Sequence, residues 1–170
     1  MARVQAFDDE RLTTVGLLME SAAGLRRVFQ RRLEESQALS NQSFDVLIRL
    51  ARSPGSELRM SELAAQTSLT PSGLTRSVDR LLEQGLVARR VCPEDRRGSF
   101  AVLTPTGQTL MDRAVPEHVA HIDEVLSDLF TPGEEEALAA LLRRLRDHLY
   151  DTSAEWALTH GEVDACPGAE

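Results

Sequence analysis

Apolar residues recur at steps of three and four positions across residues 10–36, a spacing that predicts one long amphipathic helix. At about 1.5 Å per residue this helix would be roughly 40 Å long, more than a chain of 170 residues needs internally. We therefore expect a second copy of the chain to cover part of its apolar stripe. The residues of the stripe are Val15, Leu18, Ala22, Leu25, Phe29 and Leu33.

Three Thr-Pro pairs mark the starts of further helices, because a threonine hydroxyl caps a helix and proline suits the first helical position. The last pair is followed by Glu134, which completes a capping-box pattern. The pairs are Thr70-Pro71, Thr104-Pro105 and Thr131-Pro132. Together with the apolar periodicity they predict helices over 42–52, 61–67 (opened by Ser61), 71–84, 105–129 and 132–149.

Between the last turn of the 71–84 helix and Thr104 the pattern changes from helical to strand-like. Residues 86–91 and 99–103 are two short runs rich in apolar residues, and the polar stretch 93–98 joins them. This arrangement predicts a β-hairpin with two arginines at its tip. The expected fold class is therefore mainly α with a small β-hairpin.

The helix predicted over 71–84 separates an apolar face from a polar one. Arg76 and Arg80 are a like-charged pair four residues apart, and a row of phosphates would relieve their repulsion. Ser72 lies in the first turn, where the helix N-terminus favours an anion, and Thr75 borders the polar face. A short helix, a turn and such a second helix are typical of a helix-turn-helix DNA reader. The alternative is a solvated helix face in an unrelated bundle.

The hairpin tip adds to the DNA interpretation. Arg96 and Arg97 can enter the minor groove if the hairpin lies beside the recognition helix as a wing. Asp95, two residues before Arg97, can hold the Arg97 guanidinium in one orientation. The alternative is an ordinary surface turn with a local ion pair. If the wing interpretation is right, Arg97→Ala weakens DNA binding strongly without unfolding the protein.

Charge is distributed unevenly along the chain, whose formal net charge is −8. Residues 40–104 carry nine arginines and seven acids, whereas residues 105–170 carry four arginines and fourteen acids. This distribution excludes a generic polybasic nucleic-acid binder and leaves one mildly basic middle segment. Every basic residue is arginine, whose planar fork suits phosphate and guanine better than lysine does.

Two segments together resemble the MarR (multiple antibiotic resistance regulator) family of winged helix-turn-helix proteins. Ser72-Gly73-Leu74-Thr75-Arg76, followed by Leu81-Leu82-Glu83-Gln84-Gly85-Leu86-Val87, is similar to that family's recognition helix and its exit. Pro93-Glu94-Asp95-Arg96-Arg97, followed by Leu103-Thr104 and Gly107, is similar to its wing signature. The sequence departs from the family pattern at two positions, Cys92 and Ala101.

The resemblance implies a homodimer in which different parts of the chain serve dimerisation and DNA binding. Residues 10–36 and 105–150 would form a helical dimerisation region, and residues 40–104 a winged helix-turn-helix DNA-binding domain. We expect residues 151–170 to be a partly disordered C-terminal extension. The acidic segment would then lie in the dimerisation region, away from DNA.

The function implied is a sequence-specific transcriptional regulator of double-stranded DNA, a repressor acting on a palindromic operator. Two recognition helices about 34 Å apart would read its half-sites. A small aromatic or phenolic effector would release the DNA. By resemblance the DNA-binding residues are Ser72, Thr75, Arg76, Arg80, Arg96 and Arg97, with Asp95 positioning the wing.

Two other sensing mechanisms remain open as alternatives. Cys92 follows a pair of arginines that would stabilise a thiolate, which allows a redox-responsive regulator. His118 and His121 form an H-x-x-H step near acidic residues, which allows a zinc-responsive one. Surface histidines and a passive thiol explain the same residues. A further alternative is a winged-helix protein-interaction module that no longer reads an operator.

No enzyme motif, resident metal site or cofactor is expected from the sequence. Phe29, Phe44, Leu47 and Arg49 can line an effector pocket, as can residues of any amphipathic core, so no ligand contact is assigned. Two cysteines are too few for a disulfide framework. Neither a signal peptide nor a membrane span is expected, which predicts a soluble and, in a bacterium, cytoplasmic protein.

Overall fold

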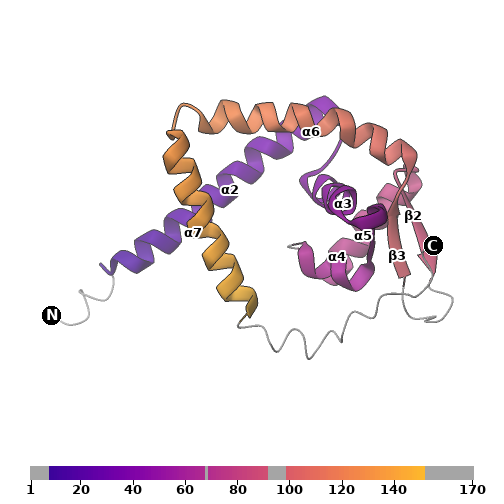
Figure 1. The fold of residues 1–170 in the computed structure, drawn as a ribbon, viewed down its shortest axis with the longest axis horizontal. Coiled ribbons are helices and arrows are strands. Elements are labelled where there is room, and N and C mark those ends of the chain that lie inside the picture. The colour runs from indigo at the N-terminus through magenta and orange to yellow at the C-terminus, as the bar shows by residue number, and fades with distance from the viewer. Residues whose placement is uncertain (1–7, 68, 92–98, 152–170) are drawn as a thin grey trace.

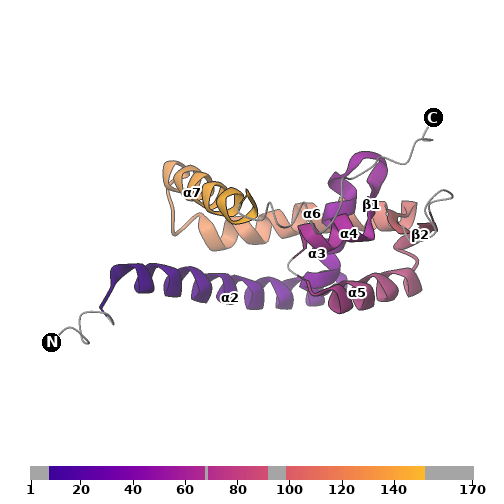
Figure 2. The same cartoon turned by 90° about the horizontal axis from the view of Figure 1, so that it is seen from below.

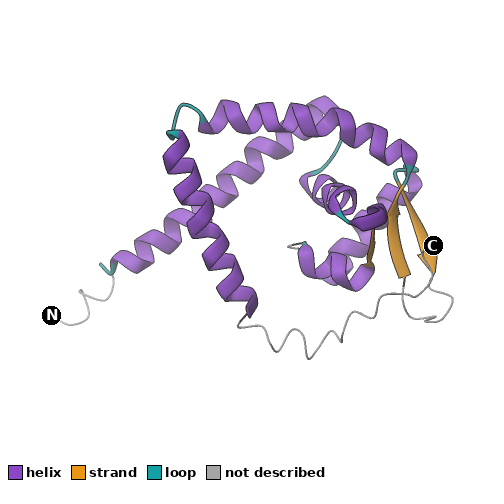
Figure 3. Cartoon of the chain, in the orientation of Figure 1, coloured by secondary structure: helices purple, strands orange, loops and turns teal. Residues whose placement is uncertain are grey.

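Helices and strands follow one another nearly as the periodicity predicts. The computed structural model describes residues 8–67, 69–91 and 99–151, and these form six α-helices and a three-stranded antiparallel sheet (Figures 1 and 3). The mainly α fold class with a small β-hairpin is therefore confirmed. The elements are α2 (Glu10–Gln37), α3 (Asn41–Arg52), the 3-10 helix η1 (Pro54–Ser56), β1 (Glu57–Arg59), α4 (Met60–Gln66), α5 (Pro71–Glu83), β2 (Val87–Val91), β3 (Ser99–Leu103), α6 (Pro105–Leu126) and α7 (Pro132–Asp151).

The three Thr-Pro pairs all start helices, but they do so in two ways. The hydroxyls of Thr70 and Thr104 accept hydrogen bonds from the backbone N–H three residues later, at 3.1 and 3.0 Å. The Thr131 hydroxyl instead donates to the Glu134 carboxylate at 2.8 Å, and the same carboxylate accepts from the Thr131 N–H at 2.8 Å. These bonds stabilise the charged carboxylate and lower the pKa of Glu134. The predicted capping box is thus present on its glutamate side.

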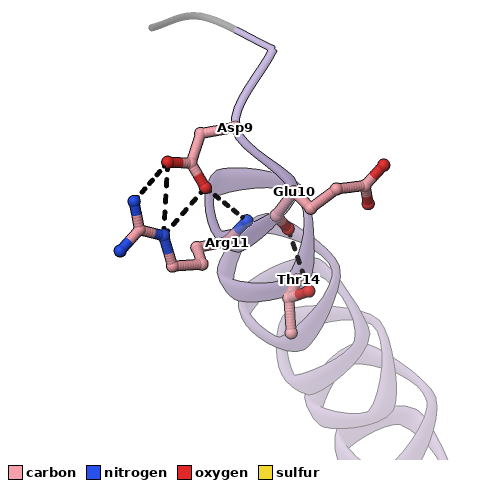
Figure 4. Close-up of polar contacts among 4 residues, drawn as sticks. All are labelled: Asp9, Glu10, Arg11 and Thr14. Atoms are coloured by element: carbon pink, nitrogen blue, oxygen red, sulfur yellow. Dashed lines mark hydrogen bonds and ion pairs between the residues drawn. The ribbon is translucent and has the colours of Figure 1, made fainter.

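The start of α2 is capped by a carboxylate rather than by a hydroxyl (Figure 4). Asp9 Oδ1 accepts from the Arg11 backbone N–H at 2.9 Å, and the Arg11 guanidinium pairs with the same carboxylate. These contacts lower the pKa of Asp9. The cap is therefore charged at neutral pH and complements the positive end of the helix dipole.

Most elements have a boundary that differs from the one predicted by one to three residues, and two of the differences have a cause in hydrogen bonds. Helix α4 begins at Met60 and not at Ser61, because the Glu62 carboxylate accepts a hydrogen bond from the Arg59 N–H at 3.0 Å and so caps the chain one residue earlier. Helix α6 ends at Leu126, three residues before the predicted end. The chain turns there, and the Phe130 N–H bonds back to the Leu126 carbonyl at 3.0 Å.

The sheet contains a strand that the sequence pattern did not predict. The strand order is β1-β3-β2, so the hairpin of β2 and β3 continues into β1 through the central strand β3. Arg59 of β1 and Arg90 of β2 lie directly opposite Phe100 of β3, one on each side. The predicted hairpin is therefore part of a larger sheet, which joins it to the residues just before α4.

The buried core lies among α3, α4, α5, the sheet and the first half of α6, and Leu33 near the end of α2 joins it. We call α3, α4, α5, the sheet and the first half of α6, with the segments that connect them, the winged-helix part. On α5 the predicted core face is confirmed: Leu74, Val78 and Leu81 are buried, and Leu82 is half-buried. The largest fully buried side chains are Leu47, Leu50, Leu63, Leu74, Leu81, Met111, Val46 and Val78.

Helix α2, the second half of α6 and helix α7 extend away from this core (Figures 1 and 2). Helix α2 meets α6 through hydrogen bonds, from Arg113 Nε to Gln37 Oε1 at 3.0 Å and from Arg32 Nη2 to Glu124 Oε2 at 3.1 Å. Leu33 is the only buried residue described on α2, and none of the side chains described on α7 is buried. None of the helices described has the length and apolarity that crossing a bilayer requires.

Candidate nucleic-acid interface

Helix α5 presents the predicted polar residues to solvent because its other face is anchored in the core. Leu74, Val78 and Leu81 are at most 2 % exposed, and this fixes the rotation of the helix about its axis. All four DNA-binding candidates on this helix are exposed as a result. They are Ser72, Thr75, Arg76 and Arg80.

Within this exposed face two side chains are bonded to the backbone of their own helix. Arg76 Nε donates to the Ser72 carbonyl at 3.2 Å, and Thr75 Oγ1 donates to the Pro71 carbonyl at 3.0 Å. Such bonds hold each side chain along the first turn of α5. The N-terminal end of the helix, where backbone N–H groups favour an anion, therefore carries a guanidinium and two hydroxyls.

One of the two acidic residues on α5, Asp79, is neutralised from the sheet. Arg89 Nη2 of β2 donates to Asp79 Oδ1 at 2.7 Å, which pairs the carboxylate and ties the helix to the hairpin. Asp79, the half-buried carboxylate on the same helix as Arg76 and Arg80, is thus already paired with Arg89 of β2. Arg89 was not among the predicted site residues, and no spacing in the sequence indicates its role, since the pair is set by how β2 packs against α5.

The two strands of the hairpin that would form the wing are confirmed. Strand β2 ends at Val91 and β3 begins at Ser99, and the two are paired along their full length. The tip between them lies outside the described residues. The predictions for Asp95, Arg96, Arg97 and Cys92 therefore have no structural counterpart.

One threonine connects the exit of α5, the end of the hairpin and the start of α6. Thr104 Oγ1 donates to the Gly85 carbonyl at 2.7 Å and accepts from the Gly107 N–H at 3.0 Å. The Thr104 N–H also donates to the Leu86 carbonyl at 3.1 Å. A Cβ on Gly107 would lie 2.2 Å from that carbonyl oxygen, so this position has room for glycine alone. The Leu-Thr and Gly of the wing signature thus form a structural junction.

The two histidines of the H-x-x-H step lie on α6, where α2 and α3 meet that helix. The His118 ring is 4.9 Å from the Phe29 ring and 4.6 Å from the Phe44 ring, centroid to centroid. Burial, and to a lesser extent His121, lower the pKa of His118. In the described part of the chain no group of three or more histidine, cysteine or acidic side chains is placed to hold a metal ion.

Comparison with known proteins places the chain in a family. A family model described as the MarR family matches residues 39–98. The HTH-type transcriptional regulator PecS of Dickeya dadantii (strain 3937) is 34% identical over 139 residues, which cover 81% of this chain and 79% of PecS. The chain belongs to the MarR family.

Two solved MarR-like structures bear on the site of this MarR-family chain. Sco3205 of Streptomyces coelicolor, a MarR family transcriptional regulator determined in complex with DNA, is 33% identical with a TM-score of 0.75, over 82% of this chain and 88% of its own. BpsR of Bordetella bronchiseptica, whose DNA binding is regulated by 6-hydroxynicotinic acid, is 27% identical with a TM-score of 0.67, over 78% and 93% of the two chains. This MarR-family chain is a DNA-binding transcriptional regulator rather than an enzyme.

Proposed function

We propose that this regulator is a repressor that binds a pseudo-palindromic operator in double-stranded DNA as a homodimer and is released by a small aromatic or phenolic effector. The exposed face of α5 carries this proposal. Ser72 and Thr75 are small polar side chains at the end of the helix that would enter the major groove, and Arg76 follows them on the same face. The complex of Sco3205 with DNA supports the same use of the fold.

Within the site, each residue has a proposed role. Ser72, Thr75 and Arg76 approach base edges and phosphates, and Arg80, one turn further along, contacts the phosphate backbone. Arg97 and Arg96 enter the minor groove from the wing, with Asp95 holding Arg97. The domain division proposed is residues 40–104 for DNA binding and residues 10–36 and 105–150 for dimerisation, followed by a C-terminal extension at 151–170.

The homodimer is supported by apolar surface that one chain leaves uncovered. On α2, Leu12 is 60% exposed and Met19 67%, and on α7 Leu141 is 58% exposed. Helix α7 lies apart from α2 in Figure 2 and buries none of its described side chains in the chain's own core. An amphipathic helix that buries no face is stabilised by a partner. A second copy supplies the same helices in twofold-related positions, which matches a palindromic operator.

The effector is proposed from BpsR and from a groove at the start of α6. The groove has a volume of about 520 Å³ and lies beside the turn that follows α5. Arg113, which lines the groove and is bonded to Gln37 of α2, offers a cation to an aromatic acid. The groove lining also includes Leu86, Pro105, Thr106, Thr109 and Leu110.

A binding selection tests the proposed function. Purified full-length protein is mixed with fragmented DNA from its own genome, including the region upstream of its gene, and bound fragments are sequenced. We expect enrichment of a few fragments that share a pseudo-palindrome with half-sites one helical turn apart. The double variant Arg76→Gln/Arg80→Gln should lose the enrichment, whereas Arg52→Gln, an exposed arginine at the end of α3, should keep it. Equal recovery of all fragments by the wild type would refute operator reading.

The same duplex tests release. We expect 6-hydroxynicotinic acid, or one of a panel of benzoates and phenols, to lower the affinity for the enriched duplex in a gel-shift titration. Arg113→Gln should weaken that response while leaving the affinity without effector unchanged. If no compound of the panel changes the affinity, the effector part of the proposal is wrong and operator binding still stands.

A further inference from the structure

A phenylalanine lies buried on the outer face of the sheet, apart from the main core. Phe100 of β3 is 8% exposed, yet it does not belong to the cluster of buried residues that forms the core. The guanidinium carbon of Arg90 lies 4.4 Å from the centre of its ring, and that of Arg59 lies 5.3 Å from it. Both distances are within the range of a cation–π interaction. Two arginines therefore cover this ring.

These three residues form a line across all strands of the sheet. Arg59, Phe100 and Arg90 are directly opposite one another in the register β1-β3-β2. Opposed side chains on one face are the strongest neighbours in a sheet. Glu57 of β1 also reaches Arg90: its carboxylate accepts from Arg90 Nε at 3.1 Å and pairs with Nη2. The two edge strands are thus connected over the central strand, through the group that we call the outer-face ladder (Glu57, Arg59, Arg90 and Phe100).

The ladder connects two parts of the DNA-binding surface. Arg59 is the residue before α4, the first helix of the helix-turn-helix, and its N–H is held by Glu62. Phe100 and Arg90 belong to the hairpin that carries the wing tip. Because successive residues of a strand point to opposite faces, Arg89 reaches α5 on the inner face while Arg90 joins the ladder on the outer face.

The hairpin requires such support because β1 is only three residues long. A two-stranded hairpin alone is marginally stable in water, and so short a third strand adds few backbone hydrogen bonds. Small rotations at the base of a hairpin change the direction of its strands. A clamp at the base therefore restricts the direction that β2 and β3 take relative to α5.

We propose that Phe100, clamped by Arg59 and Arg90, is a positioning residue that fixes the direction of the wing relative to the recognition helix, so that both reach the DNA together. This inference rests on the proposed function. Phe100 itself does not contact the DNA. It limits the orientations of the wing in the free protein, so less conformational entropy is lost when the protein binds DNA.

The test compares variants that remove the clamp and leave an apolar side chain at the same position. Phe100→Leu keeps an apolar side chain and removes the ring face, and Arg90→Met keeps much of the stem and removes the charge. Phe100→Leu, which loses both cation–π contacts, should weaken binding to the duplex enriched by the wild-type protein by about tenfold, and Arg90→Met, which loses one of them, should weaken it by less. Phe100→Tyr keeps the ring face and should restore wild-type affinity. Arg52→Met removes one charge from the winged-helix part without touching the ladder and should bind as the wild type does.

Hydroxyl-radical footprinting distinguishes positioning from a general loss of structure. For Phe100→Leu and Arg90→Met we expect protection to disappear at the flanks of the duplex, where the wing contacts the minor groove, and to persist at the centre of each half-site. Uniform loss of protection, or flanks protected as in the wild type, would overturn the inference while leaving the proposed function in place. A wild-type protein that protects no duplex would overturn both.

Discussion

Gly107 shows how one backbone contact sets the identity of a residue. A Cβ at this position would lie 2.2 Å from the Leu86 carbonyl oxygen and 2.7 Å from Leu103 Cδ1, so the first turn of α6 must move if it is added. We predict that Gly107→Ala lowers the free energy of unfolding by about 1–3 kcal/mol, although alanine is the better helix former. Chemical denaturation measures this change.

Gly133 provides the matched control, since it also lies in the first turn of a helix that begins with Thr-Pro. Nothing lies within 4 Å of a Cβ built there. Gly133→Ala should therefore raise the stability, by up to about 1 kcal/mol. If both glycines respond alike, the contact with Leu86 does not determine the outcome.

His118 makes the stability depend on pH. Its lowered pKa means that the unfolded chain, whose histidine has the ordinary pKa of about 6.5, binds a proton more readily than the folded one. The contribution of the neutral ring is therefore complete above pH 6.5 and declines as the pH falls toward the folded pKa. We predict that lowering the pH from 7.5 to 5.5 reduces the free energy of unfolding more in the wild type than in His118→Phe. Denaturant titrations at both pH values measure the difference, and equal losses in the two proteins would contradict it.

At the scale of elements, the recognition helix makes a prediction about salt. Each phosphate contact releases condensed counterions, so the logarithm of the binding constant falls linearly with the logarithm of the salt concentration. We predict that Arg76→Gln and Arg80→Gln each reduce that slope by about one unit, because each removes one phosphate contact. Arg52→Gln should leave it unchanged. A protein-interaction module would show little salt dependence in any variant.

Elements with local signals were predicted well, and those without were not. Helices α5, α6 and α7 begin where Thr-Pro begins them, because the cap lies within four residues of sequence. Strand β1 was missed since three residues carry no periodicity, and it exists only because β3 lies beside it. The start of α4 was wrong by one residue because Glu62, and not a hydroxyl, caps it.

In the candidate site, too, some features could be predicted from the sequence and others could not. The exposed positions of Ser72, Thr75, Arg76 and Arg80 follow from helical periodicity and were predictable from the sequence. The pairing of Arg89 with Asp79 and the stacking on Phe100 depend on which elements meet in space. No single sequence contains that information in its spacing, since the residues come from different elements.

At the scale of the whole molecule, the uncovered apolar surface makes the last prediction. In one chain, Leu141 and Leu145 on α7 are 58% and 42% exposed, and the described residues leave this helix almost without neighbours. A second copy that covers them explains both the exposure and the length of α2. We predict that the wild type sediments at micromolar concentration with the mass of two chains, and Leu141→Asp/Leu145→Asp with the mass of one.

Ala140 supplies the control because it is exposed and lies about 100° from Leu141 and about 140° from Leu145 around the axis of α7. Ala140→Asp adds the same kind of charge and should remain dimeric. The monomeric double variant has only one DNA-binding domain. Its affinity for the palindrome should fall by about a hundredfold or more, because the second half-site is no longer bound in an effectively intramolecular step. A double variant that stays dimeric would show that this face of α7 does not hold the two chains together. A monomer that binds the palindrome as tightly as the wild type would show that operator binding does not depend on the pairing of two chains.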